Sequence, residues 1–149
     1  MSKVIQQEIK DLGFTAELLN FKEENAYFYL LDEIIAEQAL LLEGRLGSTV
    51  YASTTSPTQD YIKRAEKCFV AAEVVQRRIN VILGNVIGAG NEINISHEVA
   101  QKKAYLDEAE SLLVKISAGI TTDDQGGGYA GGVLVTSHFA STSSINGLE

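Results

Sequence analysis

The chain has 149 residues, of which 45% are hydrophobic, and a net charge of −8 at neutral pH. These values predict one globular domain with a hydrophobic core. The acidic excess argues against nucleic acid as a primary partner, because phosphate binding needs clustered Lys and Arg. A single cysteine, Cys68, excludes an intramolecular disulfide, and no apolar run is long enough to predict a membrane span.

The first part of the chain is predicted to form two helices. Apolar residues at helical spacing over residues 4–12 indicate the first helix, and Gly13 is a suitable C-cap. The second is expected over residues 23–43, where an apolar stripe faces a side rich in Asp and Glu. This stripe comprises Tyr27, Leu30, Leu31, Ile34, Ile35, Leu41 and Leu42. Residues 48–55 are predicted to be a loop or a short extended piece.

The third predicted helix has the clearest start signal. Ser56 can act as its N-cap, Pro57 occupies the first helical position, and Gln59 stands where a capping-box partner belongs. The following stripe is the longest in the chain and predicts a central helix. It comprises Tyr61, Ala65, Cys68, Phe69, Ala72, Val75, Ile79, Ile82 and Leu83. A glycine-containing loop, residues 84–90, is expected to end this helix.

The fourth helix is predicted over residues 97–117, with Ser96 as N-cap and Gly119 at its end. Its expected core residues are Val99, Leu106, Ala109, Leu112, Leu113 and Ile116. The predicted fold class is therefore mainly α, a small bundle of about four helices with a long central helix. This helical body is assigned to residues 1–118.

The remaining segment, residues 119–149, differs in chemistry from the body. It contains no Lys or Arg, and its formal charges are Asp123, Asp124 and Glu149. Residues 126–132 are mostly glycine and predict a flexible tether. Residues 133–139 are uncharged and β-prone, which makes them an aggregation hazard when left uncovered. We therefore predict an extended, Gly-rich C-terminal arm.

Three roles for this arm are open. It folds back on its own body, stays disordered, or docks on a partner chain by adding a β-strand or by filling apolar pockets. Docking is the preferred interpretation, because glycines supply reach and the missing basic charge lowers the cost of burial. The interaction residues that it predicts are Gly126, Tyr129, Gly132, Val133, Leu134, Val135 and Phe139.

The sequence shows no constellation typical of an active site. Cys68 lies on an apolar stripe, as a small buried hydrophobe would. His97 is expected to be exposed, and neither it nor His138 shares a metal-binding spacing with Cys68. The glycine segments lack the lysine or third glycine of nucleotide-binding loops. We predict no catalytic, cofactor-binding or metal-binding residues, and a protein that is not an enzyme.

The order of these elements resembles that of a known family. The similarity rests on residues 34–47, on Tyr51 in a polar loop, and on residues 62–66 and 71–78 of the central helix. In this pattern the chain resembles the head–tail connector (adaptor) proteins of tailed bacteriophages, small helical subunits that form a ring beneath the portal. The resemblance covers residues 1–118. The long Gly-rich tail differs from related adaptors, which often end in a helix or a shorter arm.

The resemblance implies a structural virion protein of the phage neck, made in the host cytoplasm. Such subunits form a homo-oligomeric, dodecameric ring that joins the portal to the tail and lines the DNA conduit. The arm would dock on the portal protein or a neighbouring subunit, and residues 84–90 could contact the next neck or tail component. DNA would pass without specific binding, since an acidic wall repels it, and no membrane is involved.

Other functions fit the same residues. One alternative is a soluble helical binding or regulatory module that docks its tail on a protein target. Within the phage neck, a stopper or tail-completion protein is the nearest alternative, although those folds are usually β-rich. A small enzyme with an unrecognised site is the third.

Overall fold

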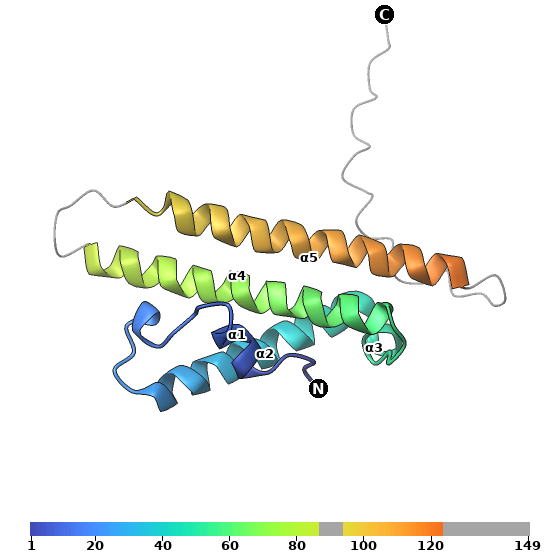
Figure 1. Cartoon of the computed structure of the whole chain (residues 1–149), viewed down its shortest axis with the longest axis horizontal. Helices are drawn as coiled ribbons and strands as arrows, with labels where there is room; N and C mark the ends of the chain where they lie inside the picture. Colours follow the sequence, from blue (N-terminus) through green and yellow to red (C-terminus); the bar gives the residue numbers. More distant parts are fainter. Residues whose placement is uncertain (87–93, 124–149) are drawn as a thin grey trace, which may run out of the picture.

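The computed structural model of the chain describes residues 1–86 and 94–123 (Figure 1). Within these ranges the protein is mainly helical and contains no strand, which confirms the predicted mainly-α class. Its elements are α1 (Gln6–Lys10), a 3-10 helix (Glu17–Leu19), α2 (Glu24–Leu46), α3 (Ser48–Tyr51), α4 (Thr58–Val86) and α5 (Ser96–Asp123).

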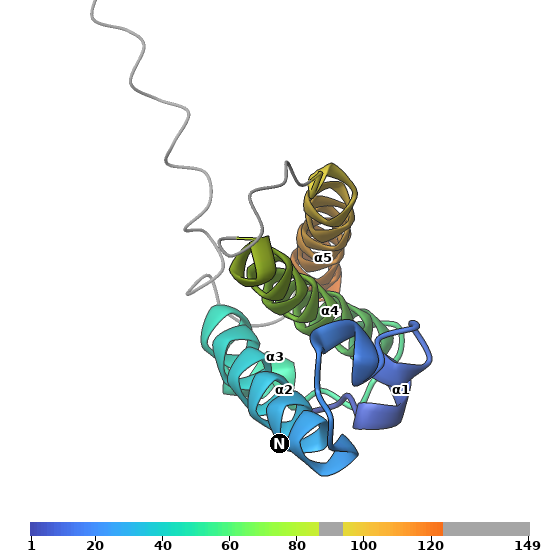
Figure 2. The same ribbon diagram turned by 90° about the vertical axis from the view of Figure 1, so that its left-hand side faces the viewer.

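Helix α4 is the centre of the molecule, as its long apolar stripe predicted. It forms an antiparallel hairpin with α5, and α1, the 3-10 helix and α2 pack against it as well. Viewed along α4, α5 and α2 lie on different sides of it (Figure 2). The body therefore consists of a long hairpin with a smaller helical layer packed against α4.

The core has two parts that meet along α4. The first joins α1, the 3-10 helix and the N-terminal part of α2 to the middle of α4, and Ile9, Leu31 and Ile34 are 0% exposed within it. The second joins the C-terminal part of α2 to α3, the start of α4 and α5. Buried alanines of α4, Ala65 among them, allow neighbouring helices to approach closely.

Two glycines end helical segments of the smaller layer. Gly13 follows α1 with a φ of +91°, and Gly47 separates α2 from α3 with a φ of +81°. A side chain at such φ values would collide with the backbone, so glycine is the residue that fits. Helix α1 itself ends at Lys10 with Asp11 as its C-cap, two residues before the predicted cap at Gly13.

Residues 48–55 were expected to be a loop or extended piece, but Ser48–Tyr51 form α3. The β-prone Ser-Thr-Val-Tyr composition misled the prediction, because tertiary contacts override such weak propensities. This short helix places the Tyr51 side chain in the core, where it is 4% exposed.

The ends of the two long helices also differ from their predicted positions. Helix α4 begins at Thr58, and the Ser56 hydroxyl donates to the Asp60 carboxylate at 2.6 Å. Helix α5 continues through Gly119 to Asp123. Gly119 does not adopt the positive φ that a glycine C-cap requires, so it does not end the helix.

Three stripe residues predicted to be buried are instead exposed. Leu41 is 54%, Leu83 43% and Val99 49% exposed. Leu41 directly precedes Leu42, which points into the second core part, and adjacent helical positions differ by about 100° in direction. Leu83 and Val99 lie toward the connected end of the α4–α5 hairpin, where α4 ends and α5 begins.

Candidate interaction surfaces

The interaction residues predicted from the sequence lie outside the described part of the chain. This applies to Gly126, Tyr129, Gly132, Val133, Leu134, Val135 and Phe139, all in residues 124–149. Of the predicted 84–90 contact loop, residues 84–86 form the last turn of α4 and the others are likewise outside. The surfaces described below belong to the helical body.

The first surface is the outer face of α2, which we define as Tyr29, Glu33, Ala36, Glu37, Leu40 and Leu41. Tyr29 is 76% and Leu40 70% exposed, and positions 29, 33, 36 and 40 follow one another along one side of a helix. Large apolar side chains thus occur on the solvent side of α2 as well as on the side that packs on the body. Exposed apolar side chains that lie close together are typical of interaction sites.

The acidic charge of the protein is concentrated around this helix. Residues 11–43 contain eight acidic side chains and one Lys, a net charge of −7 out of the total of −8. Glu33 and Glu37 are exposed and form no ion pair with any residue in the described ranges. The outer face of α2 therefore combines large apolar side chains with uncompensated carboxylates.

Opposite charges on the hairpin are mostly paired within the molecule. Arg64 contacts Glu108 at 2.6 Å and Arg78 contacts Glu98 at 3.2 Å, so both pairs join α4 to α5. Such pairs fix the register of the hairpin and contribute about 0–1 kcal/mol each when exposed.

The second surface is a groove between α1 and α5 with α4 as its floor, which we name the α1–α5 groove. It holds a cavity of about 270 Å³. The cavity is lined by Leu12, Arg64, Lys67, Cys68, Tyr105 and Glu108. Tyr105 packs against Phe14, with ring centroids 6.4 Å apart. Lys63, beside the groove on α4, pairs with Glu8 at 3.0 Å.

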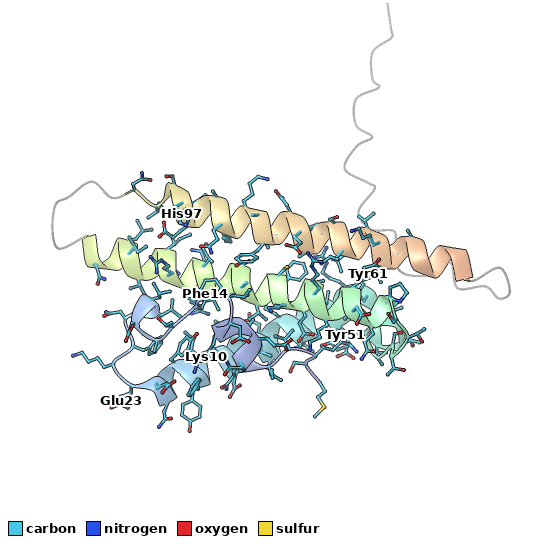
Figure 3. All side chains as sticks on the ribbon, in the orientation of Figure 1. Lys10, Phe14, Glu23, Tyr51, Tyr61 and His97 are labelled. Atoms are coloured by element: carbon cyan, nitrogen blue, oxygen red, sulfur yellow. The ribbon has the colours of Figure 1, made fainter. Side chains whose placement is uncertain are left out.

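Cys68 lies in the floor of this groove and is 6% exposed, which confirms the prediction of a buried small hydrophobe. Burial disfavours the thiolate, and the nearby Glu108 carboxylate adds to this, so the pKa of Cys68 rises to about 11. His97 is exposed at the start of α5 (Figure 3), also as predicted.

A third feature is a buried carboxylate that the sequence analysis missed. Glu66 of α4 is 0% exposed, and its Oε1 accepts hydrogen bonds from the backbone N–H groups of Lys3 (2.9 Å) and Val4 (3.2 Å). The Tyr51 hydroxyl donates to Oε2 at 2.5 Å. A buried charge requires such partners, so Glu66 fixes the N-terminal segment and α3 to α4.

The environment of Glu66 also acts on Tyr51. Burial and the hydrogen bond to the Glu66 carboxylate both disfavour the phenolate, so the pKa of Tyr51 is raised well above its usual value. The sequence held one signal for this site. Glu66 lies on the helical side that carries Ile62 and Val70, both 0% exposed, four positions to either side of it.

The N-terminal segment that Glu66 fixes forms one wall of a second cavity. This cavity measures about 480 Å³ and lies between residues 2–7 and α2. Its lining includes Val4 and Ile5 on one side and Asp32, Ile35 and Ala36 on the other. It borders the outer face of α2 at Ala36.

In residues 1–86 and 94–123, no group of three or more His, Cys, Asp and Glu side chains is placed to hold a metal ion. No helix of the described part is both long and apolar enough to cross a lipid bilayer.

Comparison with known proteins found no match: no family model fits the chain, and no curated protein or solved structure is significantly similar to it.

Proposed function

We propose that this chain is a structural subunit of the neck of a tailed bacteriophage, where copies form a ring that joins the portal to the tail. The phage assignment comes from the resemblance of residues 1–118 to head–tail connector proteins. The observation that carries an assembly role is the outer face of α2. Tyr29 and Leu40, at 76% and 70% exposure, are large apolar side chains that a partner would cover.

The build of the body supports a role as a rigid spacer. A hairpin of two helices, 29 and 28 residues long, keeps its ends at a fixed separation. The buried Glu66 holds the first residues of the chain against this hairpin. A subunit that carries load between two larger assemblies needs such internal connection.

The distribution of charge supports passage of DNA through the ring without specific binding. The net charge of −8 disfavours retention of a polyanion, and the cations Arg64, Arg78 and Arg45 already contact carboxylates. An acidic conduit lets DNA slide because the wall repels phosphates. In this proposal the arm, residues 119–149, docks on the portal or a neighbouring subunit.

Composition of purified particles tests the proposal. Quantitative mass spectrometry of the virus that encodes the chain should detect it in a fixed ratio to the portal protein, and labelled antibody should mark the head–tail junction. If the protein is present in infected cells but absent from particles, the neck assignment is wrong and the regulatory-module alternative is favoured.

The role of the arm is tested by truncation. A variant without residues 126–149 should keep the melting temperature of the full chain but lose binding to isolated portal. A matched variant without residues 140–149 keeps the 133–139 segment and should still bind. A large fall in melting temperature on the first truncation would instead mean that the arm folds back on the body.

A further inference from the structure

We infer that copies of this chain associate head to tail, with the outer face of α2 of one copy lying in the α1–α5 groove of the next. The inference deepens the proposed ring by naming the two surfaces that meet. It rests on the proposed function only for its biological setting, because the contact itself is measurable on the isolated protein.

The positions of the two surfaces require this type of contact. The outer face of α2 and the lining of the groove share no residue, and α2 and α5 lie on different sides of α4 (Figure 2). Two different patches that bind each other form a heterologous interface, which continues from copy to copy. If the rotation between copies closes, the product is a ring.

The charges of the two surfaces are complementary. The α2 face presents Glu33 and Glu37, which have no ion-pair partner among the described residues. The groove presents Arg64 and Lys67. Arg64 pairs with the exposed Glu108, whereas Lys67 forms no ion pair within the described ranges. A carboxylate of the neighbouring copy can therefore pair with Lys67, and it can share the Arg64 guanidinium with Glu108.

The apolar parts also correspond. The cavity in the groove has Leu12 and Tyr105 in its walls, and its volume of about 270 Å³ has room for one bulky side chain. Leu40, one helical turn from Glu37 on the same face, is 70% exposed and available to enter it. An apolar anchor in a pocket with a polar rim around it is a common arrangement at protein interfaces.

Charge excludes the simplest alternative, a two-fold contact between two α2 faces. Such a dimer would bring Glu33 and Glu37 of one copy against the same residues of its partner. Like charges placed together at an interface cost several kcal/mol. The groove is the surface of this chain that offers cations next to an apolar cavity.

Reciprocal charge reversal tests the contact directly. The first variant is Glu33→Lys with Glu37→Lys, and the second is Arg64→Glu with Lys67→Glu. Wild-type protein should show a mass that rises above the monomer with concentration in light scattering. Each variant alone should associate at least about tenfold more weakly, because its two surfaces now carry the same sign. An equimolar mixture of both variants should associate again, since each reversed surface meets its complement.

The control is Lys22→Glu with Lys103→Glu, which changes the net charge as much as the second variant but alters exposed residues off both surfaces. It should associate like the wild type, and melting curves verify that all variants are folded. The inference is wrong if the wild type is monomeric at every concentration, if the variants associate normally, or if the mixture does not recover.

Disulfide cross-linking separates this contact from other modes of association. In a Cys68→Ala background, Leu40→Cys and Leu12→Cys variants are oxidised separately and together. A mixture that gives heterodimers, with each variant alone staying monomeric, supports the head-to-tail contact. Cross-linking of Leu40→Cys with itself would show a two-fold contact and overturn it. This result is independent of particle composition, so the contact and the neck assignment can fail separately.

Discussion

The two layers of the molecule, the α4–α5 hairpin and α2, differ in how far their charged and apolar side chains have partners within the chain. In the hairpin, Arg64 and Arg78 of α4 meet Glu108 and Glu98 of α5. On α2, Leu40 and its neighbouring carboxylates face solvent without partners. Two ion pairs across the hairpin thus form within one chain, whereas Glu33 and Glu37 on the outer face of α2 have no ion-pair partner among the described residues. Substitutions on the two sides of this comparison test the difference.

The two sides of α2 should respond differently to the same substitution. Leu31 is 0% exposed, so Leu31→Ala should lower the free energy of unfolding by about 2–5 kcal/mol. Leu40→Ala should change it by no more than about 0.5 kcal/mol but weaken self-association. Urea denaturation of dilute monomer measures the first quantity. Equal losses of stability would show that the outer face belongs to the core.

Loss of the buried Glu66 carboxylate should weaken the attachment of the N-terminal segment to α4. Glu66→Ala leaves the Lys3 and Val4 N–H groups and the Tyr51 hydroxyl without their acceptor, which should cost about 2–3 kcal/mol of stability. Hydrogen exchange at Lys3 and Val4 should become faster. Glu37→Ala, an exposed carboxylate, is the matched control, and unchanged exchange in the Glu66 variant would contradict the anchor.

The same site predicts a loss of stability in alkali. Because the pKa of Tyr51 is raised by folding, its contribution is complete below the unfolded value of about 10 and is lost as the pH rises above it. Tyr27 acts in the same direction through burial. Tyr51→Phe should reduce the slope of stability against pH above 10 by up to about 1.4 kcal/mol per pH unit. An unchanged slope in denaturation series would refute this.

The smallest effect is expected at a pair that links the two layers. Arg45 of α2 donates two hydrogen bonds of 2.8 Å to Glu110 of α5, with side-chain exposures of 40% and 53%. Glu110→Gln should lower the free energy of unfolding by at most about 1 kcal/mol, and the loss should be smaller at high salt. Glu37→Gln, which breaks no pair, should have no effect. A larger loss at Glu110 would mean that the layers depend on this single contact.

Much of the fold follows from the spacing of apolar residues. The central position of α4 was predictable, because a long apolar stripe indicates a helix that is covered by several neighbours. Helix α3 was not predictable, since its Ser-Thr-Val-Tyr sequence favours strands and its Tyr51 is fixed by a distant residue. The same limit applies to Glu66, whose backbone partners Lys3 and Val4 lie more than 60 positions away.

The candidate site was predicted in a different part of the chain. Interaction residues were predicted within residues 126–139 because this segment is uncharged, and these residues lie outside the described ranges. The outer face of α2 was not predicted, because the apolar stripe assigned to residues 23–43 was wide enough to count exposed residues as buried ones. Leu41 and Leu42 both fitted it, yet one is 54% exposed and the other 1%. Which of two adjacent leucines is covered depends on where α4 and α5 lie. This is decided by tertiary packing and not by the local sequence pattern.

The anchor at Glu66 has a consequence for the order in which the protein forms. Its contacts join residues separated by 62 and 63 positions, whereas α4 and α5 are neighbours along the chain. The Lys3 and Val4 N–H groups therefore have no carboxylate acceptor until this part of α4 is in place. Docking of this segment is expected to follow pairing of α4 with α5, because closing a long loop precedes its gain in contacts.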